Sequence, residues 1–184
     1  MIRRSLAALA VVGLLGLLVL AFFDDATHRS VPPQGDMLGT ESGESFQAYS
    51  ERAEKTLLDA PDDQPVYALV TFSEGLTPEE AGEVLASIER VNAMIVQMAA
   101  PFPLPEPIAG EDRADVFQRE LDRIGASLAG IGNVPTPELI DAAVVRDNGE
   151  VLRSLSERER IATVETLPAD AAWGRFGVRP VEIP

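Results

Sequence analysis

The longest apolar block of the chain lies at its start, from Ser5 to Phe23, and holds nineteen residues without a charged side chain. As an α-helix this block would extend about 28 Å, close to the ~30 Å thickness of the hydrocarbon core of a bilayer. It is longer than the apolar part of a cleaved secretory signal, about 7 to 15 residues, and no small-residue cleavage site ends it. The pattern therefore predicts an uncleaved transmembrane anchor, represented by Ser5, Leu6, Leu14, Leu17, Leu20 and Phe23.

The charges that flank this block predict its orientation. Arg3 and Arg4 precede the block, and positively charged residues beside a membrane segment are retained on the cytoplasmic side. We therefore expect the N-terminus in the cytoplasm and residues 24–184 outside it. The predicted organisation is a cytoplasmic tip and anchor at 1–23, a linker at 24–64 and a folded domain at 65–184.

Prolines and glycines interrupt every hydrophobic pattern in the first part of the linker. Helical spacing then returns, because apolar side chains recur every three or four residues, at Phe46, Tyr49, Ala53 and Leu57. This spacing predicts a short amphipathic helix from Ser45 to Asp59.

The domain begins with a strand–helix–strand pattern. Residues 66–72 are apolar, β-branched or aromatic and predict a buried strand. Thr77, Pro78 and Glu80 then form the sequence signature of a capping box with a proline at the first helical position. The helix that starts there is followed by a second predicted strand at 93–98.

The same pattern recurs in the second half of the domain. Strands are predicted at 140–146 and 161–165, with a short helix between them. A longer amphipathic helix, over 112–131, is inserted between the two patterns. Two such units predict an α+β fold, in which the N-terminal transmembrane helix is followed by a ferredoxin-like (split βαβ) domain with an inserted helix and with the helices on one face of the sheet. The extended segment 176–183 is predicted to add an edge strand, and Trp173 is interpreted as a packing residue.

The charge and composition of the chain exclude several classes of function. The chain has 30 acidic and 15 basic residues, a formal net charge of −15. Such a field repels nucleic acid, which we exclude as a partner. The chain has no cysteine, which excludes disulfides and thiol catalysis, and its single histidine, His28, falls in the linker. We therefore expect no cofactor, no metal site and no enzymatic activity. An enzyme that acts through carboxylates is kept as a less favoured alternative, because acidic pairs are abundant in this chain without a distinguishing pattern.

Several short motifs, in the order in which they occur, support a resemblance. They are the segment 31–39, Ser42-Gly43-Glu44, the strand 67–72 and Leu76-Thr77-Pro78-Glu79-Glu80. In this order, after the apolar block, the chain resembles a group of single-pass, membrane-anchored envelope proteins of high-GC actinobacteria. The resemblance implies an envelope location and carries no catalytic residue.

The favoured function is a non-catalytic, membrane-anchored domain that acts as an accessory or scaffold subunit of an envelope membrane protein complex. The partners expected are the membrane and another envelope or membrane protein. A respiratory-chain assembly is one specific alternative, and a protease inhibitor or pro-segment-like module with a free C-terminal tail is another. The proposed interface lies on the inserted helix and the last strand, at Val116, Phe117, Phe176, Val178 and Val181.

Overall fold

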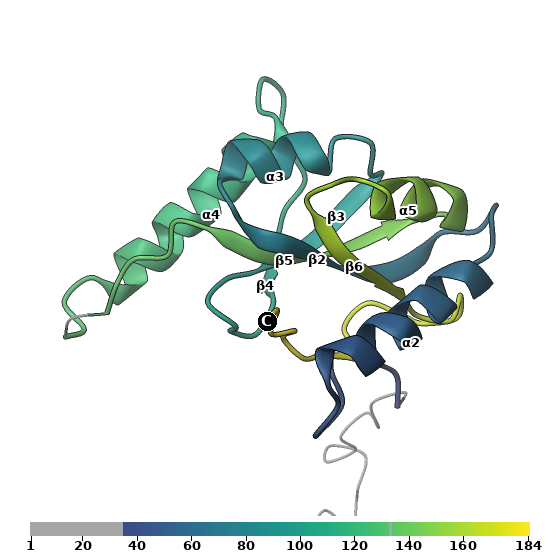
Figure 1. Ribbon diagram of the computed structural model, residues 1–184. Coiled ribbons are helices and arrows are strands. Elements are labelled where there is room, and N and C mark those ends of the chain that lie inside the picture. The colour runs from purple at the N-terminus through teal and green to yellow at the C-terminus, as the bar shows by residue number, and fades with distance from the viewer. Residues whose placement is uncertain (1–34, 133) are drawn as a thin grey trace, which may run out of the picture. The chain divides into compact units, whose positions relative to one another are not determined.

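The computed structural model describes residues 35–132 and 134–184, and these belong to one compact unit (Figure 1). The elements in chain order are β1 (Met37–Leu38), α2 (Phe46–Asp59), β2 (Val66–Leu76), α3 (Pro78–Val84), β3 (Arg90–Ile95), β4 (Phe102–Pro103), α4 (Arg113–Leu128), β5 (Ile140–Asp147), α5 (Gly149–Ser156), β6 (Ile161–Thr166) and β7 (Gly177–Val178). The predicted anchor residues Ser5, Leu6, Leu14, Leu17, Leu20 and Phe23 lie outside the described residues.

The main sheet has five strands in the order β4-β3-β5-β2-β6, and every neighbouring pair is antiparallel. The crossover β2–α3–β3 passes over β5, and the crossover β5–α5–β6 passes over β2, so the two units interleave. Strand β5 is the middle strand, and its Arg146 lies opposite Tyr67 of β2. A separate two-stranded parallel sheet joins β1 to β7.

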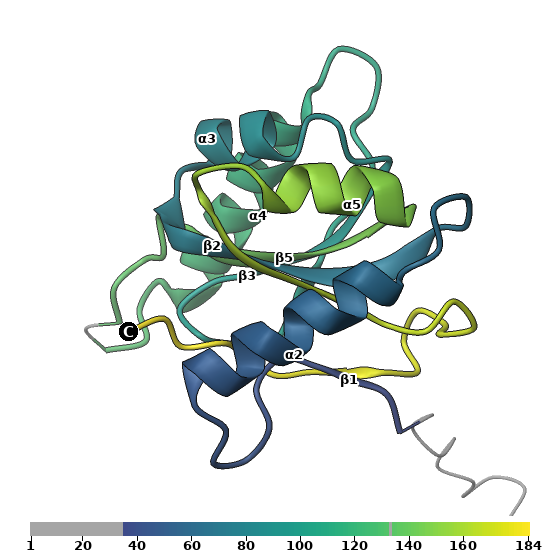
Figure 2. The ribbon, with the colours of Figure 1, turned by 45° about the vertical axis from the view of Figure 1, so that its right-hand side comes forward.

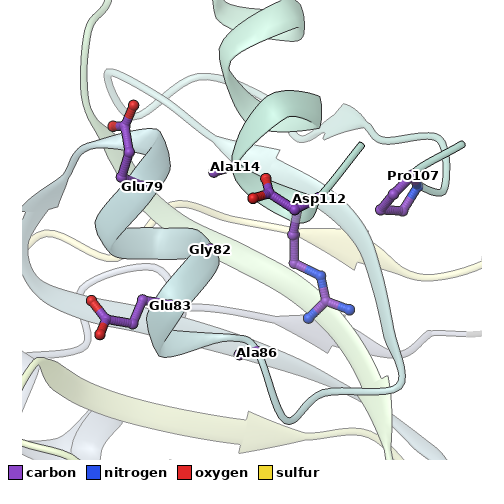
Figure 3. A pocket seen from close by; sticks show the side chains of 8 residues that line it. Glu79, Gly82, Glu83, Ala86, Pro107, Asp112 and Ala114 are labelled. Carbon is purple, nitrogen blue, oxygen red and sulfur yellow. The ribbon is translucent and has the colours of Figure 1, made fainter. Parts of the chain in front are cut away.

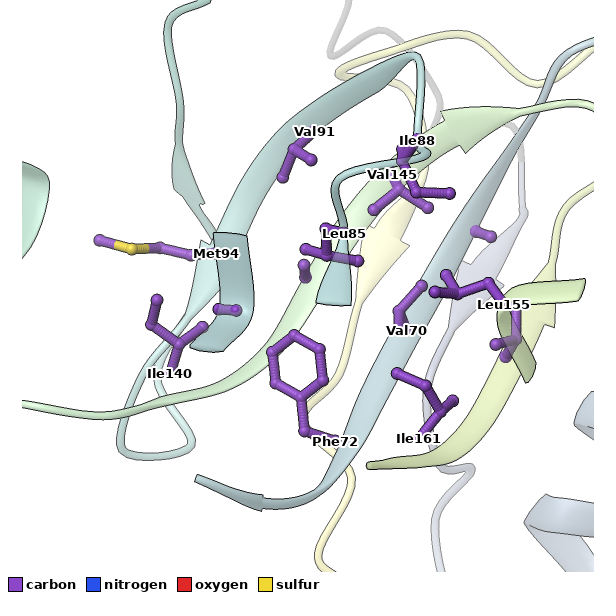
Figure 4. Packing of buried hydrophobic residues seen from close by; sticks show 14 of the residues in the cluster. Val70, Phe72, Leu85, Ile88, Val91, Met94, Ile140, Val145, Leu155 and Ile161 are labelled. Carbon is purple, nitrogen blue, oxygen red and sulfur yellow. The ribbon is translucent and has the colours of Figure 1, made fainter. Parts of the chain in front are cut away.

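Both faces of the main sheet are covered. Side chains alternate across a strand, and Val70, Phe72 and Val145 point to the face that α3, α4 and α5 cover (Figure 4). The neighbouring residues Leu69 and Val144 point to the opposite face. That face is covered by α2, β1 and the C-terminal segment, as Figure 2 shows.

The predicted fold class is wrong and is corrected as follows. Within the part of the chain that the structure describes, no helix has both the length and the apolarity to cross a bilayer. The helices are not confined to one face, because α2 buries Tyr49 and Ala53 against the second face. The physical reason is that β2, β3 and β5 are apolar on both sides, so each side must be shielded from water.

The last extended segment also differs from its prediction. Instead of joining the edge of the main sheet, β7 pairs with β1 on the second face, where Gly177 N–H donates to Asp36 O at 3.1 Å and Arg179 N–H to Leu38 O at 2.8 Å. The main sheet gains its edge strand β4 from the proline-rich segment, where Leu104 N–H donates to Asn92 O at 2.9 Å.

The predicted helix start at Thr77 is borne out. The Thr77 hydroxyl accepts from Glu80 N–H at 3.3 Å, and the Glu80 carboxylate accepts from Thr77 N–H at 3.0 Å. The inserted helix α4 starts in the same way, with reciprocal bonds between Asp112 and Asp115. It ends at Leu128, three residues before its predicted end.

Candidate functional site

Two of the predicted interface residues lie in the core. Val116 and Phe117 are on the face of α4 that packs on the sheet, and both are buried. Neither side chain is accessible to a partner. The amphipathic pattern of this helix therefore reflects its packing on the domain itself.

The other three predicted interface residues lie together in the C-terminal segment. Phe176 and Val178 are half-buried against the second face of the sheet, and Val181 is only 6% exposed. The tail that follows borders two open hollows, of about 410 and 460 Å³, which share Met98, Glu182, Ile183 and Pro184. Because Val181 holds the tail against the domain, the tail is not free as a protease-inhibitor module would require.

Three aromatic side chains meet at the start of β2. The ring centroids of Tyr67 and Trp173 are 5.9 Å apart, those of Tyr67 and Phe176 are 5.2 Å apart, and those of Trp173 and Phe176 are 5.8 Å apart. The Trp173 ring meets Phe176 edge-on, an arrangement that aromatic quadrupoles favour. Nevertheless Trp173 remains 42% exposed, and Tyr67 and Phe176 are half-buried.

Two arginines accompany these rings. The guanidinium carbon of Arg146 lies 5.7 Å from the centre of the Tyr67 ring, within the range of a cation–π contact. Arg175 lies between Trp173 and Phe176 in the chain and is exposed. We refer to Tyr67, Arg146, Trp173, Arg175 and Phe176 as the aromatic–arginine patch. Trp, Tyr and Arg are the residues most enriched in the energetic centres of protein interfaces.

A separate cleft, with a volume of about 490 Å³, lies between α3 and the start of α4 (Figure 3). Glu79 and Glu83 of α3 and Asp112 of α4 line it, so its rim is acidic. Its one basic residue, Arg113, donates to the backbone carbonyls of Leu85 and Ile88. Burial lowers the pKa of the Arg113 guanidinium below its usual value. The cleft presents no nucleophile beside a base, and so no acyl-transfer chemistry follows from it.

A polar cluster links α2 to β6. The Arg52 guanidinium is ion-paired with Glu44 at 2.8 Å and with Glu165, whose side chain is 2% exposed. The other oxygen of Glu165 accepts from Gly39 N–H at 2.5 Å. The hydrogen bond from Arg52 lowers the pKa of Glu44 to about 2, whereas burial raises the pKa of Glu165.

The Tyr49 hydroxyl extends this cluster inward. It is buried beside Thr71, Thr163 and Glu165 and makes no hydrogen bond to another described residue. Burial, and next the nearby charge of Glu165, raise the pKa of Tyr49 above its usual value. The Tyr49 hydroxyl therefore stays protonated near neutral pH, and the contacts of the cluster attach α2 and Gly39 to the sheet.

The residues that the structure describes contain no group of three or more His, Asp or Glu side chains close enough to hold a metal ion. The surface best suited to recognition is the aromatic–arginine patch, and of its residues only Phe176 was predicted as a site. Trp173 was interpreted as a packing residue. Its exposure follows from the path of the loop before β7, which the sequence does not indicate. Comparisons of the chain with protein-family models, with curated proteins and with solved structures find no match.

Proposed function

We propose that this protein is a non-catalytic accessory or scaffold subunit of an envelope membrane protein complex, and that it binds another protein of that complex through the aromatic–arginine patch. The observation that carries the proposal is the exposure of Trp173 within a cluster of three rings. An indole that packed only within its own domain would be more deeply buried, since Trp loses much apolar surface on burial.

The location that we propose is the outer side of the cell membrane, with the N-terminus in the cytoplasm. The support is in the sequence: the apolar run of residues 5–23, with Arg3 and Arg4 before it and Asp24 after it. Gly35, where the described residues start, is only eleven residues beyond Asp24. At no more than ~3.6 Å per extended residue, the domain would stay within ~40 Å of the membrane. A partner in the same membrane would be within its reach.

The experiment is affinity purification of the tagged full-length chain from its native membranes in mild detergent, with identification of the co-purifying proteins by mass spectrometry. We expect one membrane assembly at near-stoichiometric recovery. Trp173→Ala should lose that assembly, because hot-spot aromatic residues cost 2 kcal/mol or more when truncated, a loss of about thirtyfold in affinity.

The matched control is Ile108→Ala. Ile108 is 69% exposed and lies in the loop before α4, outside the aromatic–arginine patch. This variant should recover the assembly as the wild type does. Recovery of the wild-type chain alone, or equal recovery with Trp173→Ala, would contradict the proposal.

A further inference from the structure

We infer that the segment that binds the aromatic–arginine patch is an acidic stretch of the partner protein, with Asp or Glu carboxylates beside an apolar or aromatic side chain. This inference rests on the proposed function and adds to it the chemistry of the partner. It follows from how the arginines of this chain are used.

Eleven arginines fall within the described residues, and eight of them have partners there. Six are ion-paired with carboxylates, namely Arg52, Arg90, Arg119, Arg123, Arg153 and Arg160. Two donate to backbone carbonyls: Arg113 to Leu85 and Ile88, and Arg158 to Val84. Among residues 35–132 and 134–184, the guanidiniums of Arg146, Arg175 and Arg179 have neither kind of partner.

Two of these arginines, Arg146 and Arg175, belong to the aromatic–arginine patch, and the third, Arg179, directly follows β7. Arg146 covers the Tyr67 ring, and Tyr67 contacts Phe176. Arg175 and Arg179 flank β7 on either side. Phe176 and Val178 pack against the second face of the sheet, whereas Arg175 and Arg179 are exposed to solvent.

Met37 of β1 completes this outer surface. Its sulfur lies so close to Gly177 that a Cβ there would be 2.3 Å from it, and the Met37 side chain is itself partly exposed. The outward side of β7 therefore presents an apolar side chain between two guanidiniums, with the exposed Trp173 indole before them. Such a surface fits a partner strand or loop that alternates carboxylates with apolar groups.

The charge of the chain makes these unpaired arginines informative. With 30 acidic against 15 basic residues, a carboxylate is the commonest charged neighbour that a guanidinium could find. The acidic residues nearest to them in the chain are Asp147 beside Arg146, Asp170 before Arg175 and Glu182 after Arg179. Among the described residues, none of these forms an ion pair with the three arginines. Within residues 35–132 and 134–184 these three positive charges have no carboxylate partner, and Arg binds carboxylates in a bidentate, directional way.

A protein segment fits this surface better than an anionic bilayer does. Charges interact over a Debye length of about 8 to 10 Å at physiological salt. A narrow segment can contact the patch alone, whereas a flat anionic surface would also meet the acidic residues around it. Because the chain has a net charge of −15, contact between those acidic residues and an anionic bilayer would be repulsive.

The test uses the full-length chain in its native membranes, with the photoreactive amino acid p-benzoylphenylalanine in place of Trp173. After irradiation, the cross-linked peptide is sequenced by mass spectrometry. We expect a peptide of a membrane-complex protein with at least two Asp or Glu residues near the cross-link. A lipid adduct, or a peptide without acidic residues, would overturn the inference.

Charge reversal gives a second readout. Arg175→Glu should lower recovery of the partner by at least about tenfold, and raising NaCl to 0.5 M should weaken recovery by the wild type. Lys55→Glu is the matched control, since it changes the net charge equally at an exposed position of α2 and should leave recovery unchanged. Equal recovery by the two variants would overturn the inference.

These results separate the inference from the proposed function. A wild-type chain that recovers no protein overturns both. Recovery that is lost with Trp173→Ala but retained with Arg175→Glu overturns the acidic segment alone and leaves the scaffold role in place.

Discussion

Arg52 of α2 is ion-paired with the buried carboxylate of Glu165 on β6. The same carboxylate accepts a hydrogen bond from Gly39 N–H, and Arg52 also donates to Gly39 O at 2.9 Å. Helix α2, the segment after β1 and strand β6 therefore meet at one charged pair. This pair holds in place the helix that covers the second face of the sheet.

Arg52→Ala should lower the free energy of unfolding by about 3 kcal/mol, because it leaves the Glu165 charge buried without its cation. The measurement is urea unfolding of the full-length chain in mild detergent. Arg160→Ala is the control, since Arg160 pairs with Glu80 at the surface and its loss should cost less than about 1 kcal/mol. Equal losses for the two variants would contradict the importance of the buried pair.

Replacing Glu165 as well should reverse part of that loss. In the double variant Arg52→Ala/Glu165→Gln the buried group is neutral, so the charge that lacked a partner is gone, and the amide can still accept from Gly39 N–H. We expect the double variant to be at least about 1 kcal/mol more stable than Arg52→Ala alone in the same unfolding assay. A double variant that is less stable than the single one would show that Glu165 is not the source of the penalty.

Glu44 should contribute to stability in a defined acidic window. Its pKa falls from 4.5 to about 2 in the folded chain, chiefly through its hydrogen bond to Arg52. A lowered folded-state pKa means that the contribution is present above the unfolded value and is lost as the pH falls from about 4.5 to about 2. The expected size is about 1 kcal/mol, because Arg52 is partly open to solvent.

The measurement is the pH dependence of thermal unfolding for the wild type and for Glu44→Gln. The difference between the two curves should be constant above pH 5 and vanish toward pH 2. Glu165 is present in both chains, and its raised pKa has the opposite sign, so the subtraction removes most of its effect. A difference that does not change with pH would contradict this assignment.

Gly39 is required by both its conformation and its surroundings. Its φ is +92°, and a Cβ there would lie 1.9 Å from Arg179 O. Gly39→Ala should therefore separate β1 from β7 and destabilise the fold by about 2 kcal/mol or more. Gly43→Ala is a close control, with a φ of +81° but no atom within 4 Å of the added Cβ. It should cost about 1 kcal/mol, and equal thermal stability of the two variants would rule out the steric effect.

Local patterns of the sequence predicted most of the elements of the domain. The apolar runs at 66–72, 140–146 and 161–165 correspond to β2, β5 and β6, the capping residue Thr77 marks the start of α3, and the amphipathic stretch 112–131 contains α4. These features depend on neighbours in the chain, which a sequence displays directly. The covering of the second face was missed, although strands that are apolar on both sides indicate that two layers are needed.

The aromatic–arginine patch was missed for a different reason. Tyr67 is more than a hundred residues from Trp173 and Phe176, and no periodicity connects them. Only the pairing of β7 with β1 places these rings beside the start of β2. The amphipathic face of α4 led instead to a wrong prediction of an interface at Val116 and Phe117. An apolar stripe that packs on its own domain and one that binds a partner have the same sequence pattern.

Truncation of Phe117 should therefore mainly lower the stability of the fold, whereas truncation of Trp173 should mainly abolish binding of the partner. Phe117 is fully buried in the core, so Phe117→Ala removes a ring and leaves a cavity that should cost about 3 to 5 kcal/mol of stability. Trp173→Ala removes a partly exposed ring and should cost about 1 kcal/mol. Unfolding in urea measures both losses.

Phe117→Leu, a milder change that keeps the fold, should retain the co-purifying assembly, whereas Trp173→Ala should lose it. If Phe117→Leu lost the assembly at unchanged stability, the result would instead support the originally predicted interface on α4.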